Sequence, residues 1–101
     1  MMSDDAPPAT VSFDCPTVQV FHISARPCAQ LPVRILSLFS QLGLLPRLVD
    51  LSRTSTRMAL KIEQEGLGVD RANIIVEKVA NMIDVEFASL VTIGATQKND
   101  E

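Results

Sequence analysis

A strand–loop–helix unit occurs twice in this chain, and that repetition leaves few folds open. The first unit has an apolar strand over Val18 to Ser24, a break, and a helix that ends near Gly43. The second begins with a strand at Met58, turns at residues 65–68 and continues as a helix to Ile83. Units in which hydrophobic periodicity changes from two to about 3.6 residues build sheets covered by helices. The repetition therefore predicts a domain of two layers.

The first helix has the clearest pattern. Its apolar residues recur at i, i+4, i+7, i+8 and i+11, on one helical face: Leu31, Ile35, Leu38, Phe39 and Leu42. Pro32 falls in the first turn, where its missing N–H is not needed. Gly43 follows the last apolar residue, where a left-handed residue commonly ends a helix. The pattern predicts a helix from Leu31 to Leu42.

The second helix follows the loop Glu65-Gly66-Leu67-Gly68. Asp70 is placed to cap its N-terminus through a side-chain oxygen. The apolar face consists of residues at helical spacing: Ala72, Ile75, Val76, Val79 and Ile83. This element is therefore predicted to end near Ile83, just before the last strand.

The strands differ in polarity. The strand at Val18–Ser24 is apolar on both faces, which is typical of a central strand. Residues 48–54 are more polar, as at a sheet edge. Residues 58–62 alternate between apolar and polar side chains, which indicates one buried and one wet face. The last strand carries Val85, Phe87, Val91 and Ile93.

The resulting order, βαββαβ, predicts an α+β, ferredoxin-like sandwich, with a four-stranded antiparallel sheet and two helices on one face. The first and third strands would lie in the middle. The other face of the sheet would stay bare, carrying Leu90 and one apolar set of the first strand. We expect residues 1–15 to be a disordered leader, 16–95 the folded domain and 96–101 a flexible tail.

Composition excludes several classes of protein. The chain has 101 residues, enough for one domain, and no apolar run of the roughly 18–20 residues that a membrane helix needs. Its start lacks the basic and apolar regions of a signal peptide, so we expect a cytoplasmic protein.

The formal charge is −3, and the sequence has no basic stripe that would suggest binding to nucleic acid. Two cysteines and one histidine exclude a structural zinc site and favour neither a disulfide nor any other metal site.

No pair of groups is arranged for catalysis. His22 lies among apolar neighbours, so a hydrogen-bonded or partly buried structural histidine is favoured.

Arg26 ends the first strand and is expected to face the N-terminus of the first helix, whose free N–H groups favour anions. An arginine there can bind the carboxylate of an amino acid or of a partner; the alternative is a surface arginine over the loop. The candidate ligand-binding residues are Arg26, Cys28, Ala29, Gln30 and Leu31.

The polar edge strand suggests contacts with other chains. Because its backbone groups are unpaired in a monomer, two such edges can join about a two-fold axis into a homodimer. The predicted seam comprises Leu48, Val49, Asp50, Leu51 and Ser52. Three arginines on the same hairpin, Arg47, Arg53 and Arg57, are candidates to meet an acidic surface of a protein partner, although a solvated surface is the alternative.

Several short elements resemble those of one family, the small regulatory subunits of acetolactate synthase, which contain an ACT domain. They are Ile23-Ser24-Ala25-Arg26, Arg34-Ile35-Leu36, Leu38-Phe39-Ser40-Gln41-Leu42-Gly43 and Ile83-Asp84-Val85. The similarity covers residues 18–90 and is greatest to the short form of the valine-insensitive isozyme. It implies a homodimer with an eight-stranded sheet, and a large catalytic partner that itself holds thiamine diphosphate, magnesium and flavin. No cofactor would bind here.

One departure from the family bears on ligand binding. ACT domains that bind effectors usually have Pro-Gly in the turn before the first helix. Alignment through the Leu-Phe-Ser-Gln element places Ala29 and Gln30 there. A glutamine side chain would occupy space that the ligand needs, so feedback by valine is not expected.

The resemblance predicts a non-catalytic regulatory subunit that activates acetolactate synthase in branched-chain amino-acid biosynthesis. The alternative is a free-standing sensor that binds an amino acid and regulates another enzyme. Gln30 disfavours the sensor and Arg26 favours it.

Overall fold

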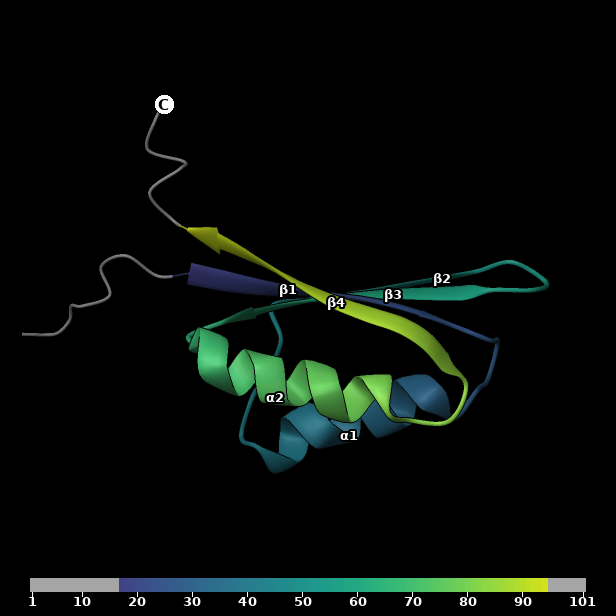
Figure 1. Ribbon diagram of the computed structural model, residues 1–101, viewed down its shortest axis with the longest axis horizontal. Helices are drawn as coiled ribbons and strands as arrows, with labels where there is room; N and C mark the ends of the chain where they lie inside the picture. Colours follow the sequence, from purple (N-terminus) through teal and green to yellow (C-terminus); the bar gives the residue numbers. More distant parts are fainter. Residues whose placement is uncertain (1–16, 95–101) are drawn as a thin grey trace, which may run out of the picture.

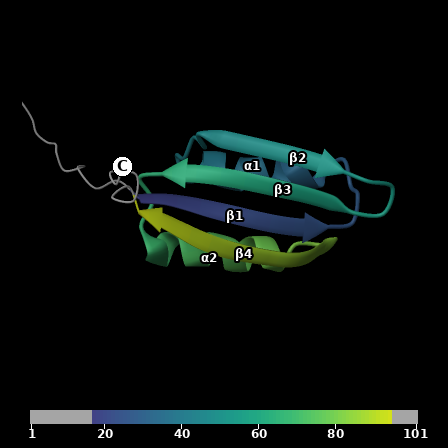
Figure 2. The same ribbon diagram turned by 90° about the horizontal axis from the view of Figure 1, so that it is seen from above.

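The computed structural model describes residues 17–94, which fold in the order βαββαβ. The elements are β1 Thr17–Ala25, α1 Leu31–Gln41, β2 Leu48–Arg53, β3 Met58–Glu65, α2 Val69–Ala80 and β4 Val85–Gly94. All neighbouring strands are antiparallel, in the sheet order β2-β3-β1-β4 (Figure 2). The predicted ferredoxin-like fold is confirmed, with β1 and β3 central and β2 at an edge. The leader, the tail and Cys15 lie outside the described residues.

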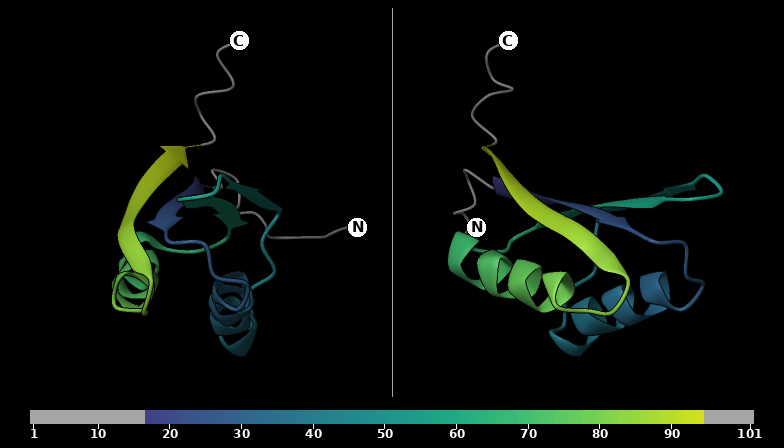
Figure 3. Two further views of the ribbon diagram at one scale, coloured as in Figure 1. Left: turned by 90° about the vertical axis from the view of Figure 1, so that its right-hand side faces the viewer. Right: turned by 45° about the vertical axis from the view of Figure 1, so that its right-hand side comes forward.

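Both helices cover the same face of the sheet (Figures 1 and 3). The core between the layers is almost entirely aliphatic, apart from Phe21 of β1 and Phe39 of α1. These two rings meet edge to face, with centroids 5.2 Å apart, the geometry that aromatic quadrupoles favour. Neither helix in the described part of the chain has the length and apolar character needed to span a bilayer.

The end of α1 follows the prediction. Gly43 has φ +75°, in the left-handed region. Its N–H donates to the Ser40 carbonyl at 3.0 Å, and the Leu44 N–H donates to the Phe39 carbonyl at 2.9 Å. This pair of bonds is a Schellman motif, which satisfies carbonyls that the helix leaves free.

The second helix differs from the prediction at both ends. Gly68, in an extended conformation, is its N-cap, and Asp70 lies in the first turn without a capping hydrogen bond. Asp70 is favourable there because a negative charge complements the helix dipole. The helix ends at Ala80, where the Asn81 side chain donates to the Glu77 carbonyl. Ile83 therefore falls in the following turn and is 74% exposed, so its assignment to the helix face is wrong.

The face opposite the helices, called here the open face, is bare within residues 17–94, as predicted. Leu90, however, lies opposite Phe21 in the β1–β4 register and packs against the core. Its prediction on the open face is wrong, because the alternation in β4 runs the other way. The large apolar side chains on the open face are Val18, Val20, Leu48, Phe87, Val91 and Ile93.

Two buried glutamines tie loops to the sheet. The Gln19 side chain donates from Nε2 to the Leu67 carbonyl at 3.0 Å. Its Oε1 accepts a hydrogen bond from the Thr92 hydroxyl at 2.7 Å. Gln64, beside Gln19 on β3, donates to the Leu45 carbonyl at 3.3 Å. Buried amides need such partners, so these bonds hold the β3–α2 and α1–β2 connections at one end of the sheet.

Candidate functional site

The loop between β1 and α1 lines a cavity of about 370 Å³. Its residues come from the loop, the first turn of α1 and the ends of two strands: Pro27, Cys28, Ala29, Pro32, Leu51, Arg53 and Met58. The loop residues and the strand residues are far apart in the sequence, so no local pattern groups them. β2 and β3 bring Leu51, Arg53 and Met58 against the loop. The cavity therefore joins part of the predicted ligand site to part of the predicted seam.

The start of α1 lacks a side-chain cap. Gln30 is the N-cap residue, and the Leu31 N–H already donates to the Cys28 carbonyl at 3.2 Å. Pro32 has no N–H to offer. The helix therefore presents fewer free donors to an anion than an ordinary helix N-terminus does.

The predicted ligand residues do not all meet. Cys28 and Ala29 line the cavity, whereas Leu31 is buried in the core. The Oε1 atom of Gln30 accepts a long hydrogen bond, 3.4 Å, from Arg34 on the exposed side of the helix. Arg26 points toward β4, with its Nε 4.0 Å from the Glu86 carboxylate. Arg26 therefore faces β4 and not the helix N-terminus, where the sequence analysis expected it.

Arg53 is the cation that the fold brings to this cavity. Its Nη1 donates to the Thr54 carbonyl at 3.2 Å, and it forms no ion pair with any residue between 17 and 94. Sequence analysis named it for partner binding but not for the ligand site. The signal that could have found it is its position at the end of the edge strand that follows α1.

No strand within residues 17–94 pairs with the outer side of β2. The Thr54 N–H donates to the Arg57 carbonyl at 2.8 Å, so Leu48, Asp50 and Ser52 face β3 in the alternating ladder. Val49, Leu51 and Arg53 then direct their N–H and C=O groups outward. Their side chains lie on the helix-covered side, where Val49 and Leu51 remain 43% and 49% exposed. The predicted seam residues thus form an open, partly apolar edge.

The three arginines of the hairpin do not form one group. Arg47 precedes β2 and binds two carboxylates, Glu63 at 3.0 Å and Glu65 at 3.1 Å. The hydrogen bond from Arg47 is the main cause that lowers the pKa of Glu63, while partial desolvation opposes it. Arg53 and Arg57 lie at the other end of β2. Their grouping with Arg47 is wrong, because the length of the strand separates them.

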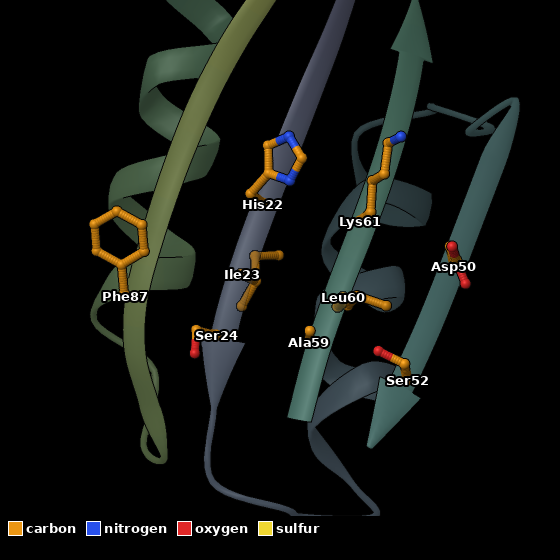
Figure 4. A pocket seen from close by; sticks show the side chains of 9 residues that line it. All are labelled: His22, Ile23, Ser24, Asp50, Ser52, Ala59, Leu60, Lys61 and Phe87. Carbon is orange, nitrogen blue, oxygen red and sulfur yellow. The ribbon is translucent and has the colours of Figure 1, made fainter. Parts of the chain in front are cut away.

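A second, smaller hollow of about 230 Å³ lies on the open face (Figure 4). Small side chains of three neighbouring strands, Ser24, Ala59 and Ser52, leave the space, and Phe87 borders it. His22 lies beside it and is exposed, so a partly buried histidine was the wrong expectation. The Lys61 ammonium pairs with Glu63 at 3.6 Å. No group of three metal-ligating side chains occurs among residues 17–94.

Comparison with known proteins places these features in a family. The family model described as an ACT-like domain matches residues 12–97. The sequence matches none of the curated proteins with which it was compared.

Several solved structures share the fold. The ACT domain from GTP pyrophosphokinase of Chlorobium tepidum has a TM-score of 0.65 at 11% identity, over 73% of this chain and 96% of that chain. The C-terminal domain of the MgtC protein from Mycobacterium tuberculosis has a TM-score of 0.63 at 14% identity, over 82% and 93%.

A homoserine dehydrogenase from Thiobacillus denitrificans has a TM-score of 0.61 at 10% identity; the match covers 78% of this chain but 17% of the enzyme. At these identities the likeness shows the fold alone. ACT domains are regulatory modules associated with amino-acid binding rather than catalytic units. On the family match, which spans most of its length, this chain belongs to the ACT-like domain family.

Proposed function

We propose that this chain is a non-catalytic regulatory subunit, similar to the small subunit of acetolactate synthase, that works as a homodimer on a large catalytic subunit. The observation that carries the proposal is the unpaired β2 edge in a domain of a regulatory family. Sequence elements such as Leu38-Phe39-Ser40-Gln41-Leu42-Gly43 support acetolactate synthase as the partner.

The pairing of two β2 edges has a preferred register. A two-fold axis perpendicular to the sheet pairs side chains on the same face, so it must pass through a residue. An axis through Asp50 would set two carboxylates opposite each other, which is destabilising. An axis through Leu51 pairs Val49 with the partner's Arg53 and Asp50 with the partner's Ser52. This register uses the outward backbone groups of Val49, Leu51 and Arg53 in both copies.

A cysteine scan tests the register. In a background in which Cys15 and Cys28 are serine, Leu51→Cys is expected to form a disulfide-linked dimer on mild oxidation, because the two Cα atoms of such a pair lie about 5.5 Å apart. Asp50→Cys is the matched control and should cross-link far less. Faster cross-linking of the Asp50 variant would indicate that the axis passes through Asp50 instead of Leu51. No cross-link at any position from 48 to 53 would reject the β2 seam.

Activation follows from selective binding. A regulatory subunit that binds the active conformer of its partner more tightly shifts the population toward that conformer. We expect this protein to co-purify with an acetolactate synthase catalytic subunit from its native cell and to raise the activity of the isolated catalytic subunit. A catalytic subunit whose activity is unchanged by a saturating amount of the protein would refute the proposed function.

An amino-acid sensor is the second candidate, and the cavity beside α1 favours it. Cys28 and Ala29 would border the ligand, and the unpaired Arg53 could bind its carboxylate. Calorimetric titration with the twenty amino acids discriminates the two functions. A sensor should bind at least one of them at micromolar to low millimolar concentration, and Arg53→Gln should weaken that binding.

A further inference from the structure

Three arginines stand at the same end of three neighbouring strands, and we call them the arginine row. Arg53 ends β2, Arg57 precedes β3 and Arg26 follows β1. The sheet order β2-β3-β1 places these strand ends side by side, and neighbouring strands lie about 4.8 Å apart. The arginines therefore lie at one end of the sheet. The Arg57 side chain is on the open face, where it donates to the Ser24 hydroxyl at 3.0 Å, and Arg53 borders cavities on both sides of the sheet edge.

The row has few carboxylates of its own. Glu86 is the one carboxylate in the described chain within 4.0 Å of any of the three: it pairs with Arg57 at 3.2 Å and approaches Arg26 at 4.0 Å. Asp84 adds a second acid near Arg26, since its backbone carbonyl accepts the Arg26 N–H. Arg53 has no ion pair with any residue between 17 and 94, and Arg57 and Arg26 share the single Glu86 carboxylate, so the row carries more positive than negative charge. At the opposite end of β2 the balance is reversed, with two carboxylates for Arg47.

A cavity of about 330 Å³ lies between Arg53 and Arg57. Its other lining residues are Ser52, Thr54, Thr56 and Ala59. It therefore offers guanidinium and hydroxyl donors and no acidic side chain. Arg53 also borders the cavity beside α1, which has no acidic lining residue either. Exposed arginines with adjacent hydroxyls suit carboxylate groups, which accept two parallel hydrogen bonds from one guanidinium.

We propose that the arginine row is a docking surface for an acidic segment of the protein partner. The proposal rests on the proposed function, since it names the surface by which the regulatory subunit meets its partner. A segment with at least three carboxylates fits better than a single small anion, because the donors are spread over three strand ends. Arg57 and Arg26 lie on the inner side of β2, so pairing of two β2 edges leaves them open.

Fluorescence anisotropy with a labelled hexaglutamate peptide tests the surface without the partner. We expect binding at low salt that disappears near 0.5 M sodium chloride, where exposed charges are screened beyond about 4 Å. Arg53→Gln and Arg57→Gln should each weaken binding about fivefold, the upper range for one exposed ion pair. Arg34→Gln and Arg71→Gln, exposed arginines elsewhere, are the matched controls. Thermal unfolding and light scattering would check that every variant stays folded and keeps its mass.

Three results would overturn the proposal. Equal weakening in the control variants would mean that the peptide binds diffusely. Tighter binding of a labelled hexathymidylate than of hexaglutamate would assign the row to phosphates of nucleic acid. Binding that becomes much tighter on deletion of residues 1–15 would show that the acids of the chain's own N-terminus, Asp4, Asp5 and Asp14, occupy the row.

The outcome separates this proposal from the proposed function. If the row is correct, Arg26→Gln with Arg57→Gln abolishes activation of the catalytic subunit while the dimer mass is unchanged, because both arginines lie outside the β2 seam. Activation that survives both substitutions would overturn the docking surface and leave the regulatory role intact. A wild-type protein that binds hexaglutamate with the expected variant pattern but activates nothing would refute the regulatory role and not the acidic-peptide site.

Discussion

The two edges of the sheet are built differently. β2 is six residues long, and Asp50 and Arg53 interrupt its apolar residues. β4 is ten residues long, has Glu86 as its single charge, and exposes Phe87, Val91 and Ile93 on the open face. A register shift opposite Ser24 and Ala25 distorts the start of β4, which is a common way to discourage edge pairing.

The two edges are also attached differently. Besides its backbone ladder, β4 is tied to β1 by the partly buried hydrogen bond between Thr92 and Gln19. The start of β2 is tied to β3 by exposed ion pairs of Arg47 with Glu63 and Glu65. Buried hydrogen bonds resist solvent, whereas exposed ion pairs are weakened by salt and acid. We therefore propose β2, rather than β4, as the edge that pairs with a second copy of the chain.

The largest effect is expected from a proline in β2. Leu51→Pro removes an outward N–H from the proposed seam without breaking a bond to β3. We expect the molar mass by light scattering to fall from twice 11.0 kDa to 11.0 kDa, or the variant to aggregate; Val49→Pro should act in the same way. Leu51→Ala, which keeps the N–H, is the control and should remain a dimer. A wild-type protein that is a monomer at high concentration would contradict the comparison.

A smaller effect is expected from loosening β4. Thr92→Val leaves the buried Gln19 Oε1 without its donor, which should lower the free energy of unfolding by about 1–3 kcal/mol. Thr92→Ser keeps the hydroxyl and should lower the free energy of unfolding much less. Urea denaturation of the two variants checks this. Equal losses in both would mean that the hydrogen bond does not hold the edge.

The smallest effect is expected from acid. The Arg47 hydrogen bond lowers the pKa of Glu63 in the folded protein, so the pair stabilises the fold above the ordinary glutamate value of about 4.3. That contribution is lost as the pH falls through the lowered pKa. We expect a modest decrease in Tm on acidification, reduced in Glu63→Gln. If Glu63→Gln showed the same decrease in Tm on acidification, the acid sensitivity would come from other carboxylates.

Much of the fold follows from local patterns. The α1 periodicity, Pro32 and Gly43 specify a helix and its end, and all six elements were predicted in order. The errors lie where a local pattern does not carry the information. Ile83 has helical spacing, but the Asn81 cap and the positive φ of Asp84, +77°, end the helix first. Leu90 was placed on the wrong face because alternation alone does not say which set meets the core.

The candidate sites were predicted less well than the fold. Two of the predicted ligand residues, Cys28 and Ala29, line the cavity, whereas Arg26 faces Glu86 and Leu31 is buried. Arg47 was grouped with Arg53 and Arg57 because the three are close in sequence. A strand of six residues is about 20 Å long, so closeness in sequence along β2 does not mean closeness in space.

The sequence by itself determined the element order, the central and edge strands, and the family resemblance, because each depends on spacing within short segments or on the order of the segments. Only the tertiary structure decided which arginines pair, which residues share a cavity and which backbone groups of β2 face outward. These features depend on strand register and on contacts between residues far apart in sequence, such as Arg57 with Glu86. Single polar contacts at the surface contribute too little free energy to produce a recognisable pattern in the sequence.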